Sequence, residues 1–244
     1  MPAMKLIMEN WNSFVKSEQL ITEQQKNEAE RLLTEQIKKL KKVEHNIRIG
    51  KRCEYMPPTI TESCLLEDDG QIIGFYLNEL PEKLKAYISI ANKEFMSDNV
   101  PKTLLERSDV MQTQRKLGIT RSQAKKLCTV QMSTILIEDN TLKVYRFGNL
   151  FTSSISNLNI SAPFHQDRGN LKDTVNVIMT KRKGTKGGSL SVPDYDEVFE
   201  QSDNSILVYP AWRNVHGVTP IKQIHEDGYR NSLIFYPIKK FKGI

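Results

Sequence analysis

The chain has few cysteines and no long apolar run. Its three cysteines, Cys53, Cys64 and Cys128, are widely spaced and form no Cys-x-x-Cys pair, which favours reduced thiols over a disulfide framework or a thiolate zinc site. No stretch approaches the roughly 20 apolar residues that a membrane span needs, and residues 1–11 lack the apolar block of a secretory signal. We therefore expect an intracellular protein, cytoplasmic or, in a eukaryote, nuclear.

The composition is typical of a soluble globular protein, with 39% hydrophobic and 26% charged residues. A chain of 244 residues can bury one core and carry an additional lobe. Between residues 10 and 47, apolar side chains recur at three-to-four spacing, and neither Pro nor Gly interrupts before Gly50. We therefore predict a helical N-terminal extension over residues 1–52 and a main domain over residues 53–244.

The formal net charge of +6 is concentrated in clusters. Clustered cations favour a polyanionic partner such as DNA, although a charged helix face is often simply solvated. Four blocks of the sequence carry these cations: Lys38, Lys39, Lys41, Lys42, Arg48, Lys51 and Arg52; residues 115–126; Lys181, Arg182, Lys183 and Lys186; and Lys239, Lys240 and Lys242.

The pattern along the rest of the chain is mainly β. Residues 62–66 and 72–77 flank Asp68-Asp69-Gly70 and predict a hairpin, and Pro81 opens a helix. From residue 131 onward, short β-branched or aromatic runs predict strands over residues 132–137, 142–147, 174–179, 205–209 and 230–236. Because no long helical period separates them, we expect a mainly β (α+β) fold with an antiparallel, cupin-like jelly-roll core and N-terminal helices.

Two of the four histidines lie in a pattern that suits a metal. In His165-x-Asp167, alternate residues of an extended segment point to the same side and can reach one ion. His216 follows a predicted strand and begins a turn marked by Gly217. Two imidazoles and one carboxylate form the facial triad of non-haem Fe(II) oxygenases, which leaves coordination positions open for a substrate and oxygen. We predict His165, Asp167 and His216 as metal ligands.

A candidate anion site lies on the last predicted strand. Alternation places Arg230 and Ser232 on one face, where the guanidinium can grip a carboxylate with two hydrogen bonds and the hydroxyl can add a third. A buried Arg is costly unless it is paired, so an anion is expected there. The alternative is an internal salt bridge to an Asp or Glu of the chain.

The order His-x-Asp, distal His and Arg-x-Ser resembles the 2-oxoglutarate/Fe(II)-dependent dioxygenase superfamily over about residues 130–238. The resemblance implies a double-stranded β-helix with Fe(II) and 2-oxoglutarate as cofactors. It implies that His165, Asp167 and His216 are iron ligands and that Arg230 and Ser232 bind the distal carboxylate of 2-oxoglutarate. It also implies an oxygenase activity.

Within that superfamily, the chain is most similar to the ten-eleven-translocation and J-binding-protein group. The segments that carry this similarity are QMSTIL at 131–136, PFHQDRGN at 163–170, GGSL at 187–190 and HGVTP at 216–220. The similarity implies hydroxylation of the 5-methyl group of a pyrimidine, 5-methylcytosine or thymine, in DNA. Two alternatives are a hydroxylase of a protein side chain or small molecule, and a non-catalytic cupin-like binding module.

Further residues are expected at the mouth of the barrel. We predict that Tyr145, Arg146, Asn149, Asn170 and Asn176 line it, with Asn176 as a ligand of the keto-acid and the others as candidates to hold the keto-acid or a base. The alternative for each is a core or turn residue. Trp212 and Arg213 precede His216 and are candidates to stack on a flipped base, although Trp212 is equally suited to packing. The segment from Lys181 to Lys186 ends in Gly187-Gly188 and is a candidate phosphate-contacting loop.

Overall fold

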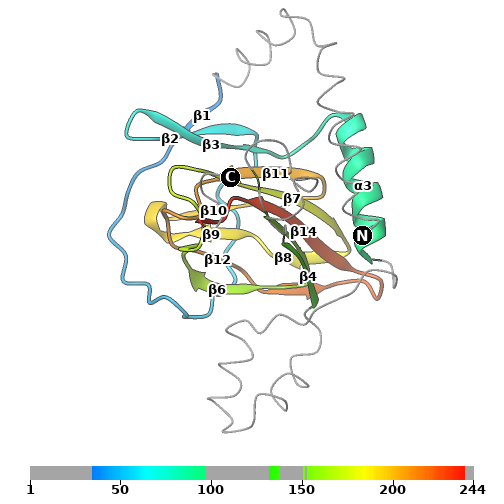
Figure 1. The fold of residues 1–244 in the computed structure, drawn as a ribbon. Helices are drawn as coiled ribbons and strands as arrows, with labels where there is room; N and C mark the ends of the chain where they lie inside the picture. Colours follow the sequence, from blue (N-terminus) through cyan, green and yellow to red (C-terminus); the bar gives the residue numbers. More distant parts are fainter. Residues whose placement is uncertain (1–34, 97–131, 138–150, 152, 240–244) are drawn as a thin grey trace, which may run out of the picture.

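The computed structural model describes residues 35–96, 132–137, 151 and 153–239, and within them two β-sheets form the core (Figure 1). The strands of the larger sheet lie in the order β1 (Ile37–Lys39), β2 (Cys64–Asp68), β3 (Gln71–Leu77), β11 (Ser205–Tyr209), β7 (Asn176–Lys183), β14 (Tyr229–Tyr236), β5 (Ser153–Leu158) and β4 (Met132–Ile137). The smaller sheet has the order β10 (Glu197–Phe199), β9 (Leu190–Val192), β12 (His216–Val218) and β6 (Ala162–His165). A separate pair joins β13 (Ile221–Gln223) to β8 (Thr185–Gly187).

The two sheets pack face to face around an apolar core. Ile178 and Leu207 of the larger sheet share one buried cluster with Val192 and Phe199 of the smaller sheet. Except for the parallel pair β1–β2, the strand pairs within both sheets are antiparallel. This arrangement is the predicted double-stranded β-helix, a jelly-roll architecture.

Alternation along the central strands separates two cores. In β11, Leu207 and Tyr209 point toward the smaller sheet, whereas Ile206 and Val208 belong to a second buried cluster on the opposite face. Helix α3 (Glu82–Met96) covers that opposite face through Ile88 and Ala91. Figure 1 shows α3 standing beside the larger sheet, away from the smaller one. The face of the larger sheet that lines the barrel is therefore distinct from the face that binds the helix.

Several predicted elements are confirmed. The hairpin β2–β3 turns at Asp69 and Gly70, which both have positive φ, of 55° and 74°, and α3 begins just after Pro81. The strands predicted over residues 132–137, 174–179, 205–209 and 230–236 correspond to β4, β7, β11 and β14. The strand predicted over residues 142–147 and the basic block at residues 115–126 lie outside the described residues.

The helical prediction over residues 10–47, a helix or a helix pair, is wrong for residues 35–47. Ile37–Lys39 form β1, which pairs in parallel with β2, and Leu40 is buried in the core between the sheets. A short apolar run has an ambiguous period, and pairing with β2 overrides local helix propensity. Residues 10–34 lie outside the described part, and the division of the chain at residue 52 remains a prediction.

After β1, the chain runs along the smaller sheet without regular structure. Its backbone is tied at three places, to Asp194 through the Val43 N–H, to Phe164 through Gly50 and Lys51, and to Val198 through Thr59 and Ile60. Residues 43–60 therefore contact both edges of the smaller sheet, β6 at residues 50–51 and β10 at residues 59–60. None of the described helices is long and apolar enough to cross a membrane.

Candidate metal and anion site

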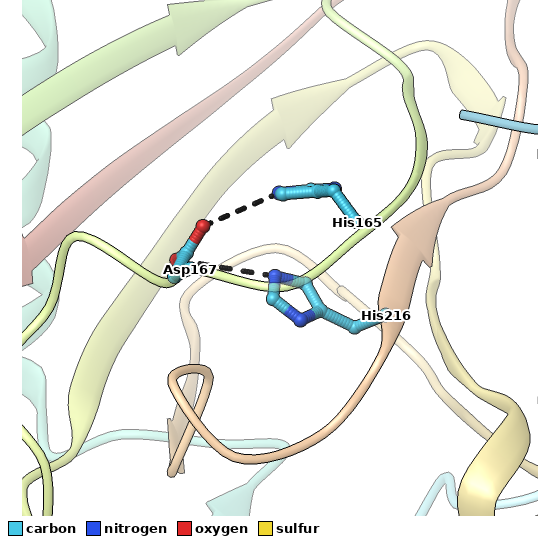
Figure 2. Close-up of side chains that lie close together, drawn as sticks. All are labelled: His165, Asp167 and His216. Atoms are coloured by element: carbon cyan, nitrogen blue, oxygen red, sulfur yellow. Dashed lines mark ion pairs between the residues drawn. The ribbon is translucent and has the colours of Figure 1, made fainter. Parts of the chain in front are cut away.

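Adjacent strands of the smaller sheet bring the two histidines together. His165 ends β6 and His216 begins β12, and the two residues are direct partners in the antiparallel pairing. Their ring centroids are 4.4 Å apart. Asp167 follows two residues after His165, where its backbone N–H donates a hydrogen bond to the carbonyl of Ala211 at 3.1 Å. Figure 2 shows both imidazoles directed at the Asp167 carboxylate.

The separations within the triad suit a shared cation. Nε2 of His165 lies 3.4 Å from one carboxylate oxygen of Asp167, and Nε2 of His216 lies 3.9 Å from the other. The three ligand atoms all lie within 4.8 Å of one another. Because nitrogen and oxygen ligands lie about 2.0–2.2 Å from a divalent metal of the first transition row, one ion can contact all three. The His165–Asp167–His216 triad therefore fits an iron-binding site.

Backbone carbonyls select the histidine nitrogens that face the metal position. Nδ1 of His165 lies 2.8 Å from the carbonyl oxygen of Pro163, and Nδ1 of His216 lies 3.1 Å from that of Asn214. A carbonyl can only accept, so each Nδ1 carries the proton. Each Nε2 is then available as a ligand, the arrangement by which metal-binding histidines are usually oriented.

The Asp167 carboxylate is held ionised. Burial pushes its pKa upward, but the hydrogen bond with His165, the charges that His216 and His165 carry when protonated, and a hydrogen bond from Asn176 together lower the pKa to about 2. The Asn176 amide donates to Asp167 at 3.0 Å, and the Asn170 amide donates to Asn176 at 2.8 Å. Both asparagines thus orient the carboxylate and also line the cavity. Contact between Asn176 and a keto-acid stays a prediction.

Arg230 is buried without a carboxylate partner among the described residues. Its side chain is 2% exposed, Nη1 contacts the Ser232 hydroxyl at 3.4 Å, and Nε has no hydrogen-bond partner. Burial, together with the nearby charge of Arg182, lowers the pKa of Arg230 to about 9, so the guanidinium stays charged at neutral pH. The internal salt bridge considered from the sequence is absent from the described part of the chain. An unpaired buried cation is costly, and a bound anion would offset that cost.

The triad and the anion site line one cavity of about 170 Å³. His165, Asp167 and His216 contribute to its wall, as do Arg230 and Ser232 from β14. The structure thus brings all five predicted residues to a single space. Apolar side chains such as Ile178, Leu190 and Val218 complete the wall.

Gly188 has a role at the site that was not predicted from the sequence. A Cβ placed at Gly188 would lie 2.6 Å from Cδ and 2.7 Å from Nε of Arg230, and the residue has a φ of +73°. Only a glycine lets the Arg230 side chain pass at this point. The glycine pair at 187–188 was visible in the sequence, but nothing in its spacing linked it to Arg230.

Two predicted nucleic-acid contacts are engaged elsewhere. Arg213 pairs with the buried Asp68, and its guanidinium also donates to the Tyr195 hydroxyl at 3.0 Å. In the segment from Lys181 to Lys186, the Arg182 guanidinium donates to the carbonyls of Thr185, Gly187 and Gln201. Arg213 and Arg182 therefore hold the fold together, whereas Trp212 contributes a buried indole N–H without a partner among the described residues.

Neither a protein-family model nor a curated protein sequence matches the chain. Among solved structures, NgTET1 in complex with 5mC DNA aligns with a TM-score of 0.44 and 15% identity, covering 80% of this chain and 83% of that one. An oxidoreductase of the 2OG-Fe(II) oxygenase family from Burkholderia pseudomallei aligns with a TM-score of 0.38 and 13% identity, covering 60% and 76%. An RmlC-like cupin protein from Desulfovibrio desulfuricans aligns with a TM-score of 0.27 and 16% identity, covering 46% and 87%. These similarities are too weak to assign a function, which depends on the site.

Proposed function

We propose that the chain is an Fe(II)- and 2-oxoglutarate-dependent dioxygenase that hydroxylates the 5-methyl group of a pyrimidine base in DNA. One observation carries the enzymatic part of this proposal. The buried guanidinium of Arg230, with an unpaired Nε, lines the same cavity as a His-x-Asp…His triad. A cavity that offers three ligands to a metal and one cation to a carboxylate suits a chelating keto-acid with a second carboxylate.

Each group of site residues would have a separate role. His165, Asp167 and His216 hold the metal from one side and leave its other positions open, and the Asn170–Asn176 pair keeps Asp167 in place. Arg230 and Ser232 bind the distal carboxylate of 2-oxoglutarate. The apolar wall of the cavity limits the access of water. Iron, 2-oxoglutarate and oxygen supply the oxidising chemistry when bound, converting a C–H group to an alcohol as 2-oxoglutarate becomes succinate and carbon dioxide.

DNA as the substrate is supported by sequence and charge. The segments at 163–170 and 216–220 resemble those of the enzymes that hydroxylate methylpyrimidines, and they contain all three metal ligands. The net charge of +6 favours a polyanion. A protein side chain or a small molecule is the alternative substrate, and the product distinguishes these cases.

The decisive variant for the enzymatic part is Arg230→Ala. We expect binding of 2-oxoglutarate, measured by anaerobic calorimetry in the presence of Mn²⁺, to weaken by about 2–4 kcal/mol, because a charge-assisted bidentate contact is lost. Binding of Mn²⁺ alone should persist, because Arg230 is not a ligand. Unchanged affinity for 2-oxoglutarate in this variant would contradict the anion site.

Nucleoside mass spectrometry of methylated and unmethylated DNA tests the substrate. The wild-type protein with Fe(II) and 2-oxoglutarate should produce a hydroxymethyl base, and the His165→Ala protein should not. Steady succinate release without any new base in DNA would direct the assignment to a protein or small-molecule substrate.

A further inference from the structure

Five lysines of the clusters in the described residues are paired with neighbouring acids. Lys38 pairs with Glu197 at 3.2 Å, Lys42 with Asp68 at 3.5 Å and Lys181 with Asp203 at 2.8 Å. Lys39 pairs with Glu67, and Lys183 pairs with Asp227. The local field of these lysines is reduced by the adjacent carboxylates. Clustering in the sequence therefore overstates the charge that these blocks offer to a polyanion.

Arg48, Lys51 and Arg52 differ from those lysines. All three are exposed, and none forms an ion pair with another described residue. Glu54 is adjacent in the sequence and exposed, but no ion pair joins it to this group. These three cations therefore keep their charge available to solvent and to a ligand.

The backbone places these cations beside the strand that carries a metal ligand. The Gly50 N–H donates to the Phe164 carbonyl at 2.7 Å, and the Phe164 N–H donates to the Lys51 carbonyl at 2.9 Å. These two bonds attach residues 50–51 to β6, the outer strand of the smaller sheet, one residue before His165. Figure 1 shows the segment reaching β6 after it leaves β1.

A buried residue fixes the segment on its other side. Cys53 is 2% exposed, and it packs so closely on Gly217, next to His216, that a Cβ at Gly217 would lie 3.1 Å from the Cys53 Cβ. The cations at 48, 51 and 52 are thus held on a backbone that is anchored to both strands of the metal site. A ligand bound to them is positioned relative to the cavity.

Apolar groups are interleaved with the cations. Tyr55 is 64% exposed and Ile49 is 47% exposed, which makes them two of the most exposed large apolar side chains in the described residues. Unpaired cations followed by an exposed aromatic ring match a nucleic-acid strand, because the cations contact phosphates and the ring stacks on a base or sugar.

We propose that residues 48–55, the β6-edge segment, bind the phosphate backbone of DNA and hold it beside the cavity through Arg48, Lys51, Arg52 and Tyr55. This inference rests on the proposed function, in that the substrate is DNA. It assigns the contact to one edge of the smaller sheet and excludes the paired lysines of β1 and β7.

The test compares two triple variants of the full chain by fluorescence anisotropy with a labelled 5-methylcytosine duplex. The first is Arg48→Ala/Lys51→Ala/Arg52→Ala, and the control is Lys38→Ala/Lys181→Ala/Lys183→Ala, which removes the same formal charge from paired positions. Each phosphate contact contributes about −0.9 to the slope of log K against log salt concentration, so three contacts contribute about −2.7. In the first variant, the slope of log K against log salt concentration should become less negative by about 2–3. In the control, it should change by less than about 1.

Two further measurements make the result specific. Tyr55→Ala should weaken binding about tenfold without altering the salt slope, because stacking releases no counterions. Anaerobic binding of Mn²⁺ and 2-oxoglutarate should match the wild type in all these variants, since none of the residues lines the cavity.

The outcomes separate this surface from the proposed reaction. Equal loss of slope in both triple variants, an unchanged slope in the first, or a wild-type protein that does not bind DNA would overturn the surface assignment. If the salt dependence of DNA binding is reduced only in the first variant and no hydroxymethyl base forms in DNA, the surface assignment is supported and the proposed reaction is refuted.

Discussion

At the scale of single residues, Asp167 depends on a chain of two amides. Asn176 donates to one carboxylate oxygen, and the buried Asn170 donates to Asn176 in turn. The rings of His165 and His216 are oriented by backbone carbonyls, those of Pro163 and Asn214. The carboxylate is therefore the ligand whose position is most open to change by mutation.

Replacing Asn176 by Ala should weaken metal binding by about 10- to 100-fold, the range observed when partners of metal ligands are removed. The reason is that Asp167 loses the hydrogen bond that fixes its rotamer. Anaerobic calorimetry with Mn²⁺ measures the change. Asn170→Ala should have a smaller effect, because the Asn170 amide reaches Asp167 through Asn176. A metal affinity in Asn176→Ala equal to that of the wild type would show that the amide is dispensable.

Four of the five candidate site residues could be selected from the sequence because alternation in extended segments is a local rule, and His216 because it follows a predicted strand. His165 with Asp167, and Arg230 with Ser232, are both pairs at spacing two, and the structure places each pair in the same cavity. The support around them was not predictable. Gly188 is distant in sequence from Arg230, and its importance appears only when β8, β9 and β14 are in place.

At the scale of elements, the β pattern was readable where apolar residues dominate. Strands β7, β11 and β14 contain β-branched or aromatic runs and were predicted. Strand β5, with the sequence SSISNL, was not predicted, because its buried serines and asparagine look like a loop. Ser156 of β5 donates to the buried Asn231 of β14, so hydrogen bonding makes the polar strand stable in the sheet. Such pairing between distant strands leaves no local signal.

The β8–β9 connection offers a prediction at this scale, Gly188→Ala. We expect weaker 2-oxoglutarate binding, measured by anaerobic calorimetry, because the new Cβ would lie 2.6–2.7 Å from atoms of Arg230 and must displace that side chain. The matched control is Gly70→Ala in the β2–β3 turn. Gly70 has nearly the same φ, +74° against +73°, but nothing lies within 4 Å of its Cβ position.

Both glycine variants should lose about 1 kcal/mol of stability because each forces an alanine into a left-handed conformation, and Gly188→Ala should lose more because its methyl group also meets the Arg230 side chain. Only Gly188→Ala should also lose affinity for 2-oxoglutarate. Equal affinities in the two variants would show that the Arg230 side chain tolerates the methyl group. The comparison thereby separates backbone strain from the steric effect on the site.

At the scale of the whole molecule, the fold class was predictable and the course of the N-terminal segment was not. Short strands without intervening helices indicate a jelly roll regardless of their exact pairing. By contrast, β1 lies at residues that carry a helical pattern, and it is defined by its parallel pairing with β2. Its place in the sheet depends on a partner that the local sequence does not reveal.

Ligand binding should be visible in the global stability. The buried charge of Arg230 has no carboxylate partner in the described residues, so the unliganded fold bears its desolvation cost. At a 2-oxoglutarate concentration of about 100 Kd, ligand binding raises the free energy of unfolding by about 2.7 kcal/mol. This increase corresponds to a rise in Tm of roughly 5–10 °C for a protein of this size. Differential scanning calorimetry with Mn²⁺ present checks this, and Arg230→Ala should show no such rise. A rise of equal size in that variant would place the ligand elsewhere.

Strand β14 has a consequence for how this protein can change over generations. Its residues alternate between two duties, since Arg230 and Ser232 face the cavity while the intervening Asn231 donates to Asn92 of α3. It is hydrogen-bonded on both edges, to β5 and to β7. Inserting or deleting one residue would exchange the two faces, sending the cation toward the helix and the amide into the cavity. This strand can therefore vary by substitution but not by a change in length. The anion-binding residues Arg230 and Ser232 and the helix contact of Asn231 must be inherited together.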